Sequence, residues 1–235
     1  MVEDKKKVAV IVQARIGSSR LPGKVLMELV NGQSVLEFLL LRLSKCKYVD
    51  NVIVATTTNP KDDVLANWLK EKGVCFFRGS EDNCLERYLG ALAQFPADII
   101  VRITSDCPLI APDVIDDMVA YYLNNRNEID YLSNRAFTNF PEGLDTEILT
   151  LKMLKDAGKN ATLQEEREHI NYFFLNRPSQ YRIRYYNHSL GCDYSRFKLS
   201  IDTVENLENA RRLFSDKKLQ TGFCFNELIK ALMKG

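Results

Sequence analysis

The chain has 235 residues, of which 46% are hydrophobic and 27% are charged, and its formal net charge is +1. This length and balance are typical of one α/β domain, so we expect a single domain over residues 1–235. A nearly neutral chain has no overall field that attracts nucleic acid or a membrane surface, so neither is expected as a partner. Scattered cysteines without a C-x-x-C pair favour a reduced, cytoplasmic setting.

The N-terminal segment predicts a buried strand followed by a basic loop. Residues 8–13 form an apolar, mostly β-branched run without polar alternation. The loop after it carries three cations within ten positions, Arg15, Arg20 and Lys24, together with small residues that allow a close backbone approach. We expect an exposed loop of this kind to bind a polyphosphate, although a surface turn with incidental basic residues remains the alternative.

Two familiar phosphate-binding patterns do not fit this loop. Five residues separate Gly17 from Gly23, and Val25 follows Lys24, so the spacing and the hydroxyl of a Walker A loop are missing. The three closely spaced glycines of the dinucleotide fingerprint are absent as well. The loop therefore points to phosphate binding of another kind.

Strand and helix patterns then alternate. Helices are predicted over 34–46, 59–72, 81–95 and 112–123, and strands over 51–57, 74–77, 98–104 and 130–134. This order predicts a doubly wound, mostly parallel sheet with helices on both faces.

From residue 135 the rhythm changes, and we interpret residues 135–196 as an excursion that binds an acceptor, contacts a second copy of the chain, or both. Within it, strands are predicted over 144–149 and 181–186, and helices over 152–159 and 162–176. A strand over 197–201 is expected to return to the sheet, followed by helices over 203–215 and 223–234.

Two aspartates follow predicted strands of the sheet. Asp106 comes after the strand that ends near Thr104, and Asp202 comes after the 197–201 strand. Ligands of open parallel sheets bind beyond the carboxyl ends of the strands, and carboxylates beside a polyphosphate usually hold Mg²⁺. Each residue has a simpler interpretation, Asp106 as a turn residue and Asp202 as a helix N-cap, but their coincidence with the basic loop favours a metal site.

Six motifs in order resemble one enzyme family. The first reads I-V-Q-A-R-I-G-S-S-R-L-P-G-K over residues 11–24; the others are ATTTNPKDD (55–63), FRGSED (77–82), VRITSDCPLI (101–110), GLDTE (143–147) and REH (167–169), with a late Asp-Thr at 202–203. This pattern resembles the bacterial cytidylyltransferases that activate sugar acids, and within them the branch named for spore coat polysaccharide biosynthesis protein F. The resemblance covers nearly the whole chain.

The resemblance implies a glycosyltransferase-A-like nucleotidyltransferase fold that uses CTP and Mg²⁺. An acceptor oxygen of a sugar acid would attack the α-phosphorus and give a CMP-sugar and pyrophosphate, in the synthesis of surface polysaccharide precursors. Carried over by motif, Arg15 and Lys24 bind the triphosphate, Gly17 and Ser18 donate to it, and Asp106 and Asp202 hold the metal. The residues expected around cytosine and ribose are Gln13, Ala14, Thr57, Arg78 and Ser80.

The acceptor side is less defined. Glu142, Asp145 and Glu147 surround a glycine and could hold sugar hydroxyls, or form a solvated strand face. His169 could bind a substrate carboxylate or assist proton transfer, or lie on a helix surface. Arg102 interrupts a buried strand and should need an anionic partner.

Two other functions remain open at this stage. A glycosyltransferase on the same architecture usually carries an Asp-x-Asp metal motif, whereas this chain has Ser105-Asp106-Cys107. A non-catalytic nucleotide-binding protein would be free to lose the metal carboxylates and the loop lysine, yet both are present. We therefore expect a cytoplasmic, homodimeric cytidylyltransferase whose partners are CTP and a small sugar acid.

Overall fold

The computed structural model describes residues 5–216 and 219–234, and it contains a seven-stranded sheet in the order β5-β4-β1-β6-β8-β7-β9. The strands β5, β4, β1 and β6 run parallel, while β8 is antiparallel to both β6 and β7, and β9 is parallel to β7. The strands are β1 (Val8–Gln13), β4 (Asn51–Thr57), β5 (Cys75–Gly79), β6 (Ile99–Thr104), β7 (Tyr131–Ser133), β8 (Glu147–Thr150) and β9 (Ile183–Tyr185). The prediction of a doubly wound, mostly parallel sheet is confirmed.

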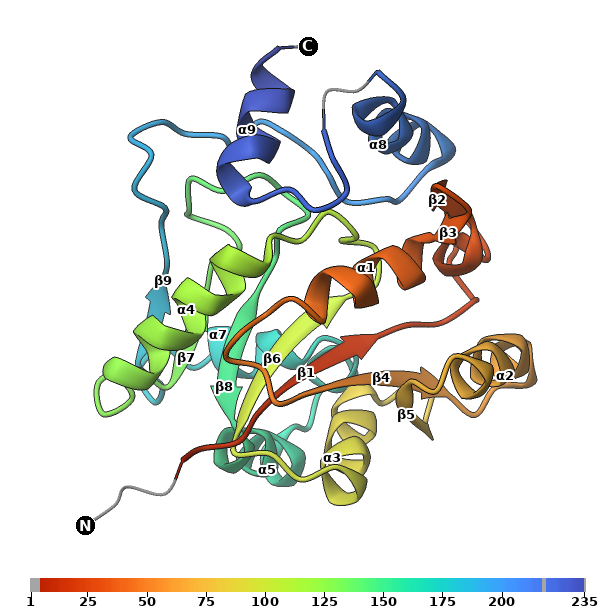
Figure 1. Cartoon of the computed structure of the whole chain (residues 1–235). Helices are drawn as coiled ribbons and strands as arrows, with labels where there is room; N and C mark the ends of the chain where they lie inside the picture. The colour runs from red at the N-terminus through yellow and green to blue at the C-terminus, as the bar shows by residue number, and fades with distance from the viewer. Residues whose placement is uncertain (1–4, 217–218, 235) are drawn as a thin grey trace.

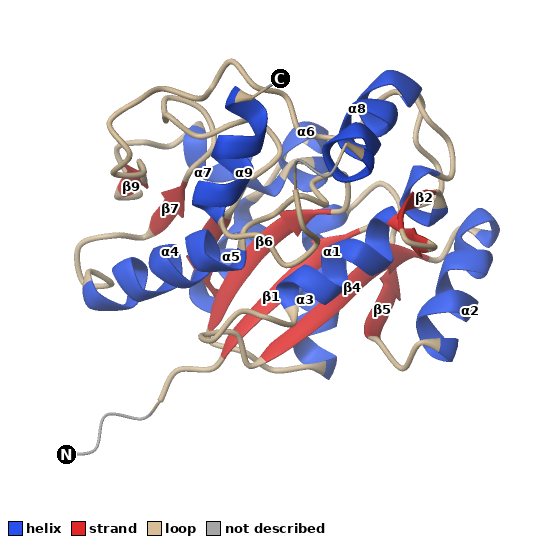
Figure 2. Ribbon diagram, turned by 45° about the horizontal axis from the view of Figure 1, so that its top comes forward, coloured by secondary structure: helices blue, strands red, loops and turns tan. Residues whose placement is uncertain are grey.

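Helices cover both faces of this sheet and form a separate core on each (Figures 1 and 2). Alternate residues of β1 point to opposite faces, so Val10 joins one core and Ile11 the other. The first core includes α1 (Val35–Leu43), α2 (Asp63–Glu71), α4 (Pro112–Asn124), α8 (Val204–Ser215) and α9 (Phe225–Met233). The second includes α3 (Cys84–Gln94), α5 (Leu151–Asn160) and α7 (Ile170–Leu175), with α6 (Gln164–Glu168) beside α3.

The basic loop is more ordered than the sequence suggests. It turns at Gly23, whose φ of 73° favours glycine, and continues into the short 3-10 helix η1 (Lys24–Leu26). A hairpin of β2 (Glu28–Val30) and β3 (Gln33–Ser34) follows, and a second 3-10 helix, η2 (Pro60–Asp62), precedes α2. Our expectation that Lys24 is exposed is wrong, because its side chain is only 9% exposed.

Two predicted elements of the C-terminal half are wrong in detail. The helix expected over 162–176 breaks at His169 into α6 and α7. The strand expected over 197–201 is reduced to one isolated bridge between Lys198 and Glu142. Its amides bind loop carbonyls instead of a sheet edge, since the Ile201 amide donates to the Asp106 carbonyl at 2.7 Å.

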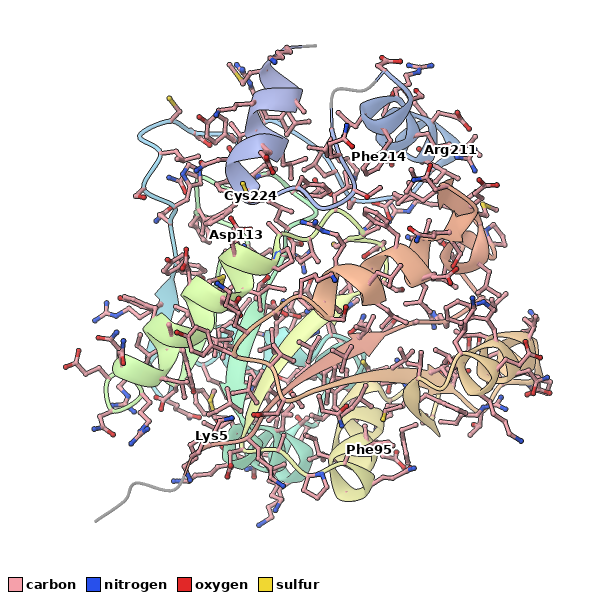
Figure 3. All side chains as sticks on the ribbon, viewed as in Figure 1. Lys5, Phe95, Asp113, Arg211, Phe214 and Cys224 are labelled. Atoms are coloured by element: carbon pink, nitrogen blue, oxygen red, sulfur yellow. The ribbon has the colours of Figure 1, made fainter. Side chains whose placement is uncertain are left out.

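The last two helices are anchored to the body by side chains labelled in Figure 3. Asp113 at the start of α4 lies beneath Cys224 and accepts from the Phe225 amide at 3.0 Å, which fixes the start of α9. On α8, Arg211 donates to the Glu28 carbonyl at 3.1 Å, and Phe214 packs on Phe38. These contacts hold α8 in place, and with it the segment that carries Asp202. In the part of the chain that is described, no helix is long and apolar enough to span a bilayer.

Candidate active site

A pocket of about 300 Å³ opens at the carboxyl ends of β1 and β6. Its lining residues are Gln13, Ala14, Arg15, Ser18, Ser19, Arg20, Lys24, Glu81, Cys84, Arg87, Thr104, Ser105, Asp106, Glu168, His169 and Asp202. Two larger hollows, of about 660 and 970 Å³, lie where the same strands begin, at Val8 and Ile99. Neither contains a predicted site residue, and ligands of parallel sheets bind at the carboxyl ends, so the smaller pocket is the candidate site.

Lys24 joins the two predicted metal carboxylates. Its Nζ lies 3.3 Å from Asp106 Oδ2, 3.3 Å from Asp202 Oδ1 and 2.6 Å from the Ile201 carbonyl oxygen. The turn at Gly23 places this lysine under the loop, and the segment before α8 brings Asp202 to it from far along the chain. Because the ammonium is buried between two carboxylates, Lys24→Met should lower stability as well as activity, contrary to the small stability effect expected for an exposed residue.

Asp202 is surrounded by cations. Arg20 donates to its Oδ1 at 2.8 Å, and Lys198 donates to its Oδ2 at 3.1 Å. Burial alone would raise the pKa of Asp202, but the hydrogen bond from Lys198 and the charges of Lys24 and Arg20 hold that pKa below its ordinary value. The N-cap alternative does not apply, because Thr203 caps α8 by accepting from the Asn206 amide.

The two carboxylates are compatible with a divalent cation. One cation, the Lys24 ammonium, lies 3.3 Å from an oxygen of each, so the two carboxylates already share a positive charge. No third acidic, cysteine or histidine side chain joins them in a metal-binding group within residues 5–216 and 219–234. A site with two carboxylates suits Mg²⁺, which takes few protein ligands and fills its other positions with water and phosphate oxygens.

Gln13 presents a donor to the pocket. Its Oε1 accepts from Arg102 Nε at 3.3 Å and from the Cys84 thiol at 3.5 Å. Both neighbours are donors, so the amide oxygen faces them, and Nε2 is left as a donor of a residue that lines the pocket. Arg102 is itself held by Glu147, directly opposite on β8, which supplies the anionic partner that the sequence predicts.

Arg87 is a pocket residue that the sequence analysis missed. It is 5% exposed, and its Nη1 donates to the carbonyl oxygens of Ser80 (2.5 Å) and Glu81 (3.0 Å). Its Nε is buried without a partner. The stem crosses Gly79 so closely that a β-carbon there would lie 2.8 Å from Arg87 Cγ. Nothing in the local sequence distinguishes this arginine from one on a helix surface.

Several predicted nucleotide residues lie beside the pocket and not on its wall. Thr57 is fully buried and donates to Asp62, whose other oxygen accepts from the Ile16 amide at 2.6 Å. Arg78 binds the Thr57 carbonyl at 2.8 Å and pairs with Asp63. Gly17 and Ser80 are likewise outside the lining, Ser80 accepting from the Asn83 amide at 3.2 Å. These groups brace the loops around the pocket, and their contact with a nucleotide stays a prediction.

Only one of the predicted acceptor residues lines the pocket. His169 does so together with Glu168, at the break between α6 and α7. Glu142 instead binds Lys198 and Ser200, each within 2.9 Å. Asp145 pairs with Arg135 at 3.4 Å, and burial raises the pKa of its carboxyl group.

Glu147 departs furthest from the acceptor role expected for it. Its side chain is 3% exposed and lies in the ion pair with Arg102. In this position Glu147 holds Arg102, and through it Gln13, and offers no open face to an acceptor.

The model of the cytidylyltransferase family matches residues 9–233 of this sequence. The chain belongs to that family. A cytidylyltransferase from Leptospira borgpetersenii is 36% identical, with a TM-score of 0.90 over 97% of this chain and 94% of that one. The spore coat polysaccharide biosynthesis protein SpsF of Bacillus subtilis is 29% identical over 227 residues, 94% of this chain and 92% of SpsF.

A CMP:2-keto-3-deoxy-manno-octonic acid synthetase complexed with CTP shares the fold of this cytidylyltransferase. The two are 18% identical, with a TM-score of 0.67 over 90% of this chain and 99% of that one. The expected nucleotidyltransferase fold is thereby confirmed, and the chain is a nucleotidyltransferase.

Proposed function

We propose that this cytidylyltransferase transfers CMP from CTP to a sugar acid with the help of Mg²⁺ and releases pyrophosphate. The observation that carries the proposal is the cluster of Lys24, Asp106 and Asp202 at the carboxyl ends of the strands. It combines a phosphate-binding cation with two metal-binding carboxylates in one pocket. Family membership and the relatedness to SpsF support a role in making polysaccharide precursors.

The transfer step forms one P–O bond and breaks another at the α-phosphorus. The acceptor oxygen supplies the electron pair and loses its proton, and pyrophosphate leaves with the electrons of the broken bond. Arg15 and Lys24 bind the triphosphate and offset the charge that develops on the leaving group. Asp106 and Asp202 would hold Mg²⁺, which adds charge neutralisation. His169, which lines the same pocket, is assigned to the acceptor and its proton.

No contact observed in the pocket favours the glycosyltransferase or the non-catalytic alternative. The carboxylates and the lysine that a binding-only protein could lose are held together in one cluster. A homodimer formed through residues 135–196 and a cytoplasmic location remain proposals that rest on the sequence pattern.

The direct test is a screen for pyrophosphate release with each nucleoside triphosphate against a panel of sugar acids. CTP should support release, and competition binding in Mg²⁺ should favour CTP over UTP by about 5- to 150-fold, the value of one unpaired buried polar group. Asp202→Asn serves as the inactive control. Equal or stronger binding of UTP would replace this proposal with a uridylyltransferase or a glycosyltransferase.

A further inference from the structure

The structure assigns Lys24 a second role, as an internal cation that closes the metal site of the nucleotide-free enzyme. The site opens when a triphosphate gives the ammonium a new partner. Metal and nucleotide then bind with positive coupling, and the free enzyme binds a divalent cation weakly. This inference rests on the proposed function, because it takes Asp106 and Asp202 as the metal ligands.

The first support is that the Lys24 ammonium is saturated. An ammonium has three N–H donors, and the structure supplies three acceptors, at 2.6, 3.3 and 3.3 Å. Two of these acceptors are the carboxylate oxygens of Asp106 and Asp202. A metal ion held by both carboxylates needs oxygens that the ammonium already occupies. The ammonium and the metal ion therefore compete for the same ligands.

The second support is the charge of the cluster. Three cations, Arg20, Lys24 and Lys198, surround three carboxylates, those of Asp106, Asp202 and Glu142. This cluster is neutral, and Asp202 is 8% exposed. A divalent cation added alone would create a net positive charge beside Lys24 and Asp202, the two buried members of the cluster, which is unfavourable. A triphosphate brings the negative charge that allows both the metal ion and the lysine to stay.

The third support is that Lys24 lies in the loop that lines the pocket. It is itself a lining residue, and it begins a 3-10 helix of only three residues. Ser18, Ser19 and Arg20 of the same loop line the pocket. A rotation of the four-carbon stem can therefore carry Nζ from the carboxylates toward a bound phosphate without unfolding a helix.

The test measures Mn²⁺ binding to the protein without nucleotide, by the electron paramagnetic resonance signal of free Mn²⁺. Lys24→Met keeps the aliphatic stem and removes the ammonium, and it should bind Mn²⁺ about 5- to 150-fold more tightly than the wild type. Lys198→Met is the matched control. Lys198 binds Glu142 and the Oδ2 of Asp202, whereas Lys24 binds Asp106 and the Oδ1 of Asp202. Removal of Lys198 therefore leaves Lys24 between the two carboxylates and should change the affinity by less than about 5-fold.

The double variant Lys24→Met/Asp202→Asn should bind Mn²⁺ no more tightly than the wild type. That result would locate the metal ion at the two carboxylates. Thermal unfolding of each variant identifies any that do not fold, and Lys24→Gln, which retains amide donors, replaces Lys24→Met if that variant unfolds. Unchanged Mn²⁺ affinity in a folded Lys24 variant would overturn the inference. Pyrophosphate release from CTP by the wild type decides the proposed function separately, because it does not depend on how the empty site is closed.

Discussion

Arg42 and Arg87 are two buried arginines on opposite faces of the sheet, and they differ in how fully the protein satisfies them. Arg42, on α1, donates from Nε, Nη1 and Nη2 to the carbonyl oxygens of Ile110, Thr221 and Phe223, at 2.7–3.1 Å. Its guanidinium also lies over the Phe223 ring, and burial lowers the pKa of Arg42 to about 10. Arg87, on α3, donates from Nη1 to two carbonyl oxygens, and its Nε is buried without a partner.

The difference follows from what surrounds each guanidinium. Arg42 holds the loop before α9 against α1, and the protein itself supplies the acceptors for its hydrogen bonds. Arg87 lines the pocket, and so does Gln13. An arginine that lines the pocket and leaves hydrogen-bonding capacity unused is a candidate to contact a substrate. We therefore expect Arg42 to act on stability and Arg87 to act on nucleotide binding.

The largest effect should come from Asp202→Asn, which changes a pocket charge with almost no change in shape. We expect the rate of pyrophosphate release to fall about 100-fold or more, or about 3 kcal/mol, because the charge acts on the transition state. Asp193→Asn is the control, since Asp193 is exposed and binds only its neighbour Ser195. A near-normal rate for Asp202→Asn would show that Asp202, like Arg42, serves the fold and not the reaction.

Arg42→Met should lower the stability of the fold. It leaves three carbonyl oxygens without their charged donor, and we expect the free energy of unfolding to fall by about 3 kcal/mol. Denaturant unfolding measures the loss, and calorimetric titration measures CTP affinity. The affinity should stay unchanged under conditions where the variant is folded. A clear loss of CTP binding in folded Arg42→Met would show that the two arginines are not separable in this way.

Arg87→Met should affect CTP binding more than stability, the reverse of Arg42→Met. We expect CTP binding to weaken about 10-fold, or about 1.4 kcal/mol, because Arg87 lines the pocket and its charge is removed. The free energy of unfolding should fall by only about 1 kcal/mol, because fewer hydrogen bonds are lost than in Arg42→Met. Arg87→Lys should recover part of the affinity. If both variants bind CTP normally, the donors of Arg87 serve the acceptor or the loop at Ser80 alone.

These differences also explain what the sequence could and could not predict. The strands β1, β4 and β6 follow from continuous apolar runs, and their order brings Lys24 and Asp106 to one edge of the sheet. The segment 197–201 has the alternation of a strand, and Leu199 and Ile201 are buried as that pattern implies. Its partners are loop carbonyls that only the tertiary structure supplies, so the pattern predicted burial correctly and pairing wrongly.

The burial of Lys24 and the position of His169 at the pocket likewise depend on the tertiary structure. The acceptors of Lys24 at Ile201 and Asp202 lie 177 and 178 residues away. His169 reaches the pocket because the predicted helix breaks there, and no glycine or proline within 162–176 signals the break. Residue type thus predicts a chemistry for the site, whereas the partner of each charge required the fold.

The smallest expected effect concerns Glu166, which anchors the wall that carries His169. The hydrogen bond from Arg177 Nη1, at 2.5 Å, holds the pKa of Glu166 below its ordinary value, and the Glu166 side chain is 1% exposed. A lowered folded pKa means that the pair stabilises the protein above the unfolded pKa of glutamate, about 4.3, and that this contribution is lost as the pH falls through the lower folded value. Glu166→Gln should therefore be less stable than the wild type at neutral pH, and the gap between their free energies of unfolding should narrow in acid. Denaturant titrations at neutral and acidic pH measure both gaps. A gap that does not depend on pH would mean that α6 is held by packing and not by this ion pair, which would place Glu166 outside the group of charges that hold the fold.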